Sequence, residues 1–195
     1  MNRRFLAVIL LALCGGPVPA GAIEVRPASA DVAGALDEGR ASARDRVPPD
    51  RLYAWFGSPD PLEPRGFVMT KLVGVRVMAA HFALRGEQPS EAEIQRIVDE
   101  PSLLVSVTIF GEEPAFAVDS YLVLVQGERI IKPHTVRFDE RAQRTSVWPR
   151  APGYQAKVVA SFPYADFDPH ALTRISVFPP TGGEVTFDLD FSAIP

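Results

Sequence analysis

Residues 172–191 read LTRISVFPPTGGEVTFDLDF, two alternating segments joined by a stretch rich in proline and glycine. In the second segment, apolar Val185, Phe187, Leu189 and Phe191 alternate with polar residues. A period of two is typical of a β-strand that has one face in a protein core and the other in water. The proline and glycine residues between the segments indicate a turn. The stretch therefore predicts an antiparallel hairpin with one buried face.

Segments of the same kind recur from residue 67 onward. They are rich in β-branched and aromatic residues, which favour strands. The predicted strands cover 67–78 (with Val73, Val75 and Val77 on one face), 103–109, 118–125, 130–138, 155–162, 172–178 and 185–191. Gln126-Gly127-Glu128 predicts a tight hairpin between two of them. Pro133 indicates that the strand 130–138 lies at a sheet edge, because proline cannot donate to a neighbouring strand.

One segment predicts a helix instead. Ser90 and Glu93 have the spacing of a capping box, and Ile94, Ile97 and Val98 then fall on one helical face. With about seven strands and this insert, the sequence predicts a mainly β chain, an antiparallel β-sandwich of immunoglobulin-like architecture with one short inserted helix. The chain lacks the Cys…Trp…Cys pattern of an antibody domain, so the expectation concerns the architecture alone.

The N-terminus, residues 1–22, predicts a cleaved signal peptide. Arg3 and Arg4 precede the apolar run Phe5–Leu13, and Ala20-Gly21-Ala22 supplies the small residues of a cleavage site. The run is too short to span a bilayer, which needs about 20 residues. We therefore expect the mature chain to begin near Ile23 and to work outside the cytoplasm, either periplasmic or secreted.

The single cysteine, Cys14, leaves a second interpretation of this N-terminus open. Residues Leu11-Ala12-Leu13-Cys14 are similar to a bacterial lipoprotein signal, which would make the protein a lipid-anchored envelope component. Leu13 is large where such signals carry a small residue, so cleavage after Ala22 is favoured. Either way, the part after residue 22 holds no thiol for a disulfide or a nucleophile.

Two further regions follow the signal. Residues 23–50 form a leader, either helical or flexible, in which Val32, Ala35 and Leu36 would lie along a weak apolar face. Residues 51–195 are expected to form a single β-sandwich domain. The formal charge of the whole chain is −4, without a basic cluster, which argues against a nucleic-acid partner. No second apolar segment predicts a membrane span.

Two places carry candidate binding chemistry. Tyr53, Trp55 and Phe56 form an aromatic cluster that is either an exposed binding anchor or a cover packed over one end of the sandwich. Asp166, Asp168 and His170 are candidate metal ligands, because two carboxylates and an imidazole occur within five residues. The competing interpretation is ordinary turn and cap chemistry around Pro169.

These patterns favour an exported, non-enzymatic envelope protein that binds another envelope protein or a small ligand, with no cofactor. The serines lack a nucleophile elbow, and the glycines lack the lysine of a phosphate-binding loop. The alternative is a small metal-dependent enzyme or hydrolase centred on the loop Tyr164–His170.

Overall fold

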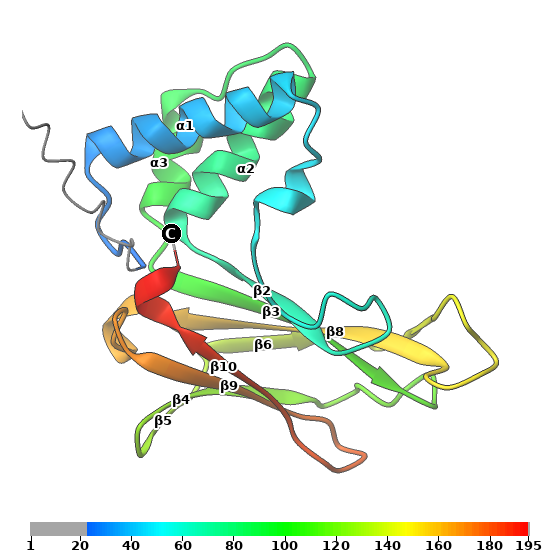
Figure 1. The fold of residues 1–195 in the computed structure, drawn as a ribbon. Helices are drawn as coiled ribbons and strands as arrows, with labels where there is room; N and C mark the ends of the chain where they lie inside the picture. Colours follow the sequence, from blue (N-terminus) through cyan, green and yellow to red (C-terminus); the bar gives the residue numbers. More distant parts are fainter. Residues whose placement is uncertain (1–22, 195) are drawn as a thin grey trace, which may run out of the picture.

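The computed structural model describes residues 23–194. The expected signal peptide, with Cys14, lies outside the described residues. In the described part, two β-sheets pack face to face, and a layer of helices lies against the outer side of the first sheet (Figure 1). The prediction of an antiparallel β-sandwich of immunoglobulin-like architecture is confirmed.

The first sheet has the strand order β1-β2-β3-β8-β6, and β7 pairs with the start of β8. Its strands are β1 (Ala54–Gly57), β2 (Arg65–Met69), β3 (Ser102–Gly111), β6 (Thr135–Phe138), β7 (Gln143–Arg144) and β8 (Tyr154–Pro163). The second sheet has the order β10-β9-β4-β5. Its strands are β4 (Tyr121–Gln126), β5 (Arg129–Ile131), β9 (Leu172–Phe178) and β10 (Val185–Asp190).

The core lies between the two sheets and is built by the alternation seen in the sequence. Leu103, Val105, Val107 and Ile109 of β3 are buried against the second sheet. On β10, every second residue is half-buried toward this core and the residues between are exposed, as predicted. The hairpins at 126–129 and 179–184 are also present, between β4 and β5 and between β9 and β10. The sandwich is therefore held mainly by apolar burial.

The segment 130–138 differs from the single strand expected. It forms β5 in the second sheet and β6 in the first, so the chain changes sheets across Lys132-Pro133-His134. Proline lacks the N–H that continuous pairing would need, which fits a crossing point between sheets.

The strand expected through Val73, Val75 and Val77 is wrong. Lys71–Leu84 forms helix α2, which begins where the hydroxyl of Thr70 accepts a hydrogen bond from the N–H of Val73 at 3.1 Å. The three valines are buried, as are Ala79 and Ala80. Because α2 is covered on most of its surface, its apolar residues are spread around the helix and do not show the usual helical stripe.

Two more helices complete the layer. The predicted helix is α3 (Glu91–Val98), with the capping box between Ser90 and Glu93 in place. In the leader, the structure has helix α1 (Ser29–Arg44), which packs along α2. Three short 3-10 turns are η1 (Pro49–Leu52), η2 (Tyr164–Asp166) and η3 (Phe191–Ala193).

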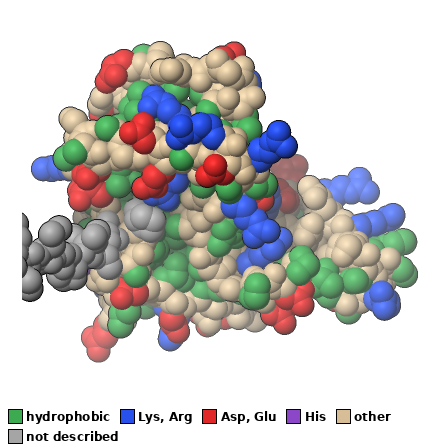
Figure 2. Space-filling model, turned by 45° about the horizontal axis from the view of Figure 1, so that its top comes forward, with side chains coloured by type: hydrophobic (Ala, Val, Ile, Leu, Met, Phe, Trp, Pro, Cys, Tyr) green, Lys and Arg blue, Asp and Glu red, His purple; other side chains and the backbone are tan. Residues whose placement is uncertain are grey.

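The surface of the helical layer has mixed charge. Figure 2 shows Lys and Arg side chains interspersed with Asp and Glu on this face, with hydrophobic side chains between them. None of the helices described is long and apolar enough to cross a membrane.

Candidate functional site

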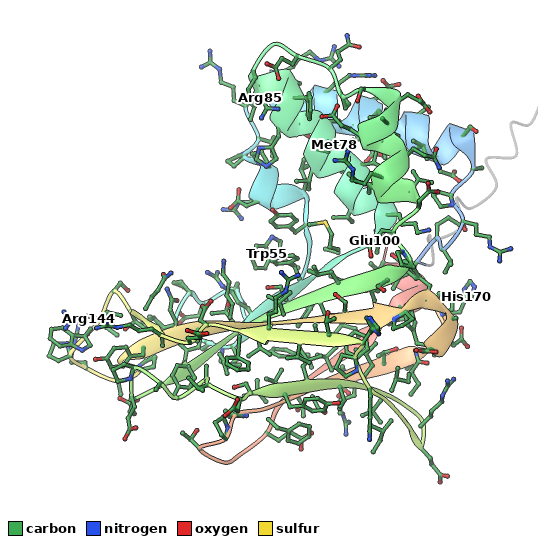
Figure 3. All side chains as sticks on the ribbon, turned by 180° about the vertical axis from the view of Figure 1, so that it is seen from behind. Trp55, Met78, Arg85, Glu100, Arg144 and His170 are labelled. Atoms are coloured by element: carbon green, nitrogen blue, oxygen red, sulfur yellow. The ribbon has the colours of Figure 1, made fainter. Side chains whose placement is uncertain are left out.

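An apolar groove of about 510 Å³ lies between the helical layer and the outer face of the first sheet. We call it the helix–sheet groove. It is lined by Met69, Thr70, Lys71, Gly74, Val77, Met78, Arg96, Ile97, Glu100, Ser102, Leu104, Arg137, Ser161 and Tyr164. In Figure 3, Met78 lies on the helical layer and Glu100 lies near the start of β3. The volume of the helix–sheet groove falls in the range of small-molecule sites, about 300–1,000 Å³.

The floor of the groove is one row of the sheet. Met69 of β2 pairs with Leu104 of β3, which in turn pairs with Ser161 of β8. All three side chains lie on the face opposite the sandwich core, because their strand neighbours Val68, Leu103 and Phe162 are buried in that core. The floor is therefore mostly apolar, with one small hydroxyl.

The roof of the groove is formed by α2 and α3, which approach each other closely. A Cβ atom at Gly74 would lie 3.0 Å from the Cγ2 of Ile97, tighter than ordinary packing. Glycine at this position thus lets α3 settle against α2 while Val77 and Met78 line the roof.

The rim of the groove carries a net positive charge. Lys71, Arg96 and Arg137 line it together with a single acid, Glu100. None of the four belongs to an ion pair within 4.0 Å among residues 23–194. Burial lowers the pKa of Lys71, and the nearby carboxylates of Asp99 and Glu100 partly offset that effect.

Tyr164 closes one end of the groove beside Lys71. The ammonium nitrogen of Lys71 lies 5.2 Å from the centre of the Tyr164 ring, within the range of a cation–π interaction. The phenol oxygen is buried, and within the described chain it has no hydrogen bond of normal geometry; the backbone N–H of Lys71 lies near it. Burial raises the pKa of Tyr164, and that N–H opposes the rise.

The three aromatic candidates do not form one surface. The Tyr53 ring stacks on Phe67 at 4.4 Å, and Trp55 meets Phe67 edge-on at 5.4 Å, on the outer face of the first sheet. Trp55 is 46% exposed, and its indole N–H donates to the carbonyl of Asp50. Phe56 lies on the opposite face, packed against Phe187 at 4.9 Å beside the sandwich core.

The candidate metal ligands Asp166, Asp168 and His170 lie in the loop after β8. The Asp168 carboxylate accepts from the backbone N–H of His170 at 2.9 Å, a turn-forming bond. The Gln126 side chain bonds both the N–H and the carbonyl of Asp168, which ties this loop to β4. Between residues 23 and 194, no three His, Cys, Asp or Glu side chains gather as they would around a metal ion.

Sequence reasoning missed the groove, because its lining comes from segments far apart in the chain. The strand expected at 67–78 would have placed Lys71 and Met78 in a sheet, whereas the structure has them on helix α2. One signal was available: Thr70 is a good helix cap, and Ala79-Ala80 favours a helix over a strand.

No family model and no curated protein matches this chain. Among solved structures, the archaellum periplasmic stator protein FlaG from Sulfolobus acidocaldarius is similar at 11% identity, covering 47% of this chain and 88% of FlaG, with a TM-score of 0.33. The IgNAR antibody domain C1 is similar at 9% identity, covering 69% of this chain and 98% of that domain, with a TM-score of 0.34. At these values the chain is assigned to no family.

Proposed function

We propose that the protein is an exported, non-enzymatic binding module of the cell envelope, and that its ligand lies in the helix–sheet groove. The observation that carries the proposal is the groove itself: an apolar hollow of about 510 Å³ with a few polar groups at its rim. Binding sites for small molecules have this composition, since apolar walls supply affinity and a few polar groups supply orientation.

Two features of the fold support a binding role. The groove lies on the outer face of the first sheet, opposite the sandwich core, so the groove does not interrupt that core. Its walls come from helices and strands, which hold side chains more firmly than loops do. The export expected from residues 1–22 would place this module outside the cytoplasm, where an envelope protein or a small ligand can reach it.

The proposal predicts saturable binding of a neutral apolar probe in the groove. We expect Nile red to gain fluorescence with the exported protein, and Ser161→Trp to abolish that gain, because a large ring on the groove floor occupies the space. Thr108→Trp is the matched control: Thr108 lies on the outer face of neighbouring β3, is half-buried, and does not line the groove. It should leave the titration unchanged.

Circular dichroism of both variants checks that they fold. Binding by folded Ser161→Trp equal to that of the wild type, or the same loss in Thr108→Trp, would contradict the proposal.

A further inference from the structure

The helix–sheet groove combines an apolar floor and roof with a cationic rim, and from this we propose that its ligand is a single-chain amphiphile with an anionic head group, a carboxylate or a phosphate. This inference rests on the proposed function and deepens it, because it names the chemistry of the ligand. The tail would lie on Met69, Leu104 and Met78, and the head group would lie at the rim near Lys71 and Arg137.

The charge of the rim is the first support. Three cationic side chains line the rim with one acid, Glu100, while the carboxylate of Asp99 also acts on Lys71 from outside the lining. None of the four lining charges belongs to an ion pair within 4.0 Å in the described part of the chain. The chain as a whole has the opposite sign, with a formal charge of −4. The rim of the groove therefore carries an excess of positive charge although the chain is acidic, and such an excess attracts an anion.

The apolar lining is the second support. Met69, Val77, Met78, Ile97 and Leu104 offer hydrocarbon and thioether surface without hydrogen-bonding groups. Methionine side chains adapt to irregular shapes, which suits a flexible alkyl tail. Each methylene group that leaves water for such a surface favours binding, by about fourfold when it is fully buried.

The backbone of the groove favours an alkyl tail over a peptide. Most lining residues lie inside helices or paired strands, so their N–H and C=O groups are already bonded within α2, α3 and the sheet. A polypeptide laid into the groove would bury its own backbone groups without partners, which is unfavourable. An alkyl tail has no such groups.

The test compares three amphiphiles with the same dodecyl tail and different heads, each below its micelle concentration, as competitors of Nile red. We expect anionic dodecanoate to bind more tightly than neutral dodecyl maltoside by up to roughly fivefold, as one exposed ion pair allows, and cationic dodecyltrimethylammonium to bind most weakly. Added salt should reduce the preference for dodecanoate, because it screens exposed charges. Dodecyl phosphate distinguishes the two anionic heads, and preference for either supports the proposal.

A charge-reversal pair tests the rim directly. Arg137→Glu should weaken dodecanoate by roughly fivefold or more and leave dodecyl maltoside unchanged. Arg129→Glu is the matched control: Arg129 is an exposed arginine on β5 in the second sheet, away from the groove, and its reversal should change neither affinity. Both residues are exposed, so both variants are expected to fold.

The outcomes separate this inference from the proposed function. Equal affinity for the three heads, or equal effects of Arg137→Glu and Arg129→Glu, would overturn the anionic ligand while leaving a groove that binds Nile red. Displacement of Nile red by an acidic, apolar peptide but by none of the amphiphiles would assign the groove to a protein segment and overturn this inference. No binding of Nile red at the groove would overturn the proposed function as well.

Discussion

Lys71 and Tyr164 meet where α2 begins and just after β8 ends, and burial shifts the pKa of both side chains. The pKa of the Lys71 ammonium is lowered and that of the Tyr164 phenol is raised, so in each case the charged form is disfavoured. The phenol oxygen is also buried without a hydrogen bond of normal geometry to any of residues 23–194, an arrangement that costs stability. Shifted pKa values often mark functional sites, and here both shifted groups lie at one end of the groove.

Tyr164→Phe is expected to leave the free energy of unfolding unchanged or to raise it by up to about 1 kcal/mol near pH 7, because it removes a buried hydroxyl that makes no hydrogen bond of normal geometry to residues 23–194. Above about pH 10 the unfolded wild-type chain releases the phenol proton while the folded protein keeps it, so the wild type loses stability as pH rises. The advantage of the variant should therefore grow with pH. Urea unfolding at pH 7 and above pH 10 measures both effects.

Tyr121→Phe, which changes an exposed tyrosine on the other sheet, controls for the loss of a phenol in general. A loss of about 1 kcal/mol or more at pH 7 in Tyr164→Phe would show that the hydroxyl has a partner in the folded protein.

The loop with Asp166, Asp168 and His170 carries a prediction of its own. Asp168 is engaged by the N–H of His170 and by the side chain of Gln126. A chelator should therefore leave the melting temperature of the protein unchanged. A ligand that binds the folded state stabilises it, so a lower melting temperature in EDTA, reversed by a specific divalent ion, would show that this loop holds a metal site.

At the scale of elements, the sequence predicted the strands that bury one face, because their apolar and polar residues alternate. It did not predict the helix that is buried on most of its surface. The strands β3, β8, β9 and β10 each have one face in the core, so their period of two is visible in the sequence. Helix α2 is packed against α1, α3 and η1, and its buried valines at 73, 75 and 77 imitate the alternation of a strand. Tertiary packing overrode the local pattern there.

The packing of α1 on α2 depends on the absence of a side chain at Gly39. A Cβ there would overlap the carbonyl oxygen of Arg76, whereas a Cβ at Gly34 on the same helix meets nothing within 4 Å. We expect Gly39→Ala to lower the free energy of unfolding by about 1–3 kcal/mol through this overlap. Gly34→Ala should raise it by up to about 1 kcal/mol, because alanine favours the helix. Urea denaturation followed by circular dichroism compares the two.

Equal effects of the two substitutions, in either direction, would show that α1 does not pack on α2 as described. The leader would then be the flexible segment that the sequence left open.

At the scale of the whole molecule, the groove exists because two inserted helices fold back over the outer face of the first sheet (Figures 1 and 3). Its lining comes from α2, α3 and four strands, so the site depends on the tertiary arrangement more than on any local motif. A sandwich could be predicted because each strand carries its own alternating pattern. It held no comparable pattern for residues such as Met69, Leu104 and Ser161, which become neighbours only across paired strands.

The most direct test of the groove as the binding site uses the methionine methyl groups. The chain has three methionines: Met1 lies in the expected signal peptide, and Met69 and Met78 both line the groove. In the protein labelled at the methionine methyl carbons, saturation with dodecanoate should shift the NMR signals of both Met69 and Met78. The indole signal of Trp148, which does not line the groove, should stay in place. Saturable binding that moves neither methionine signal would contradict the account.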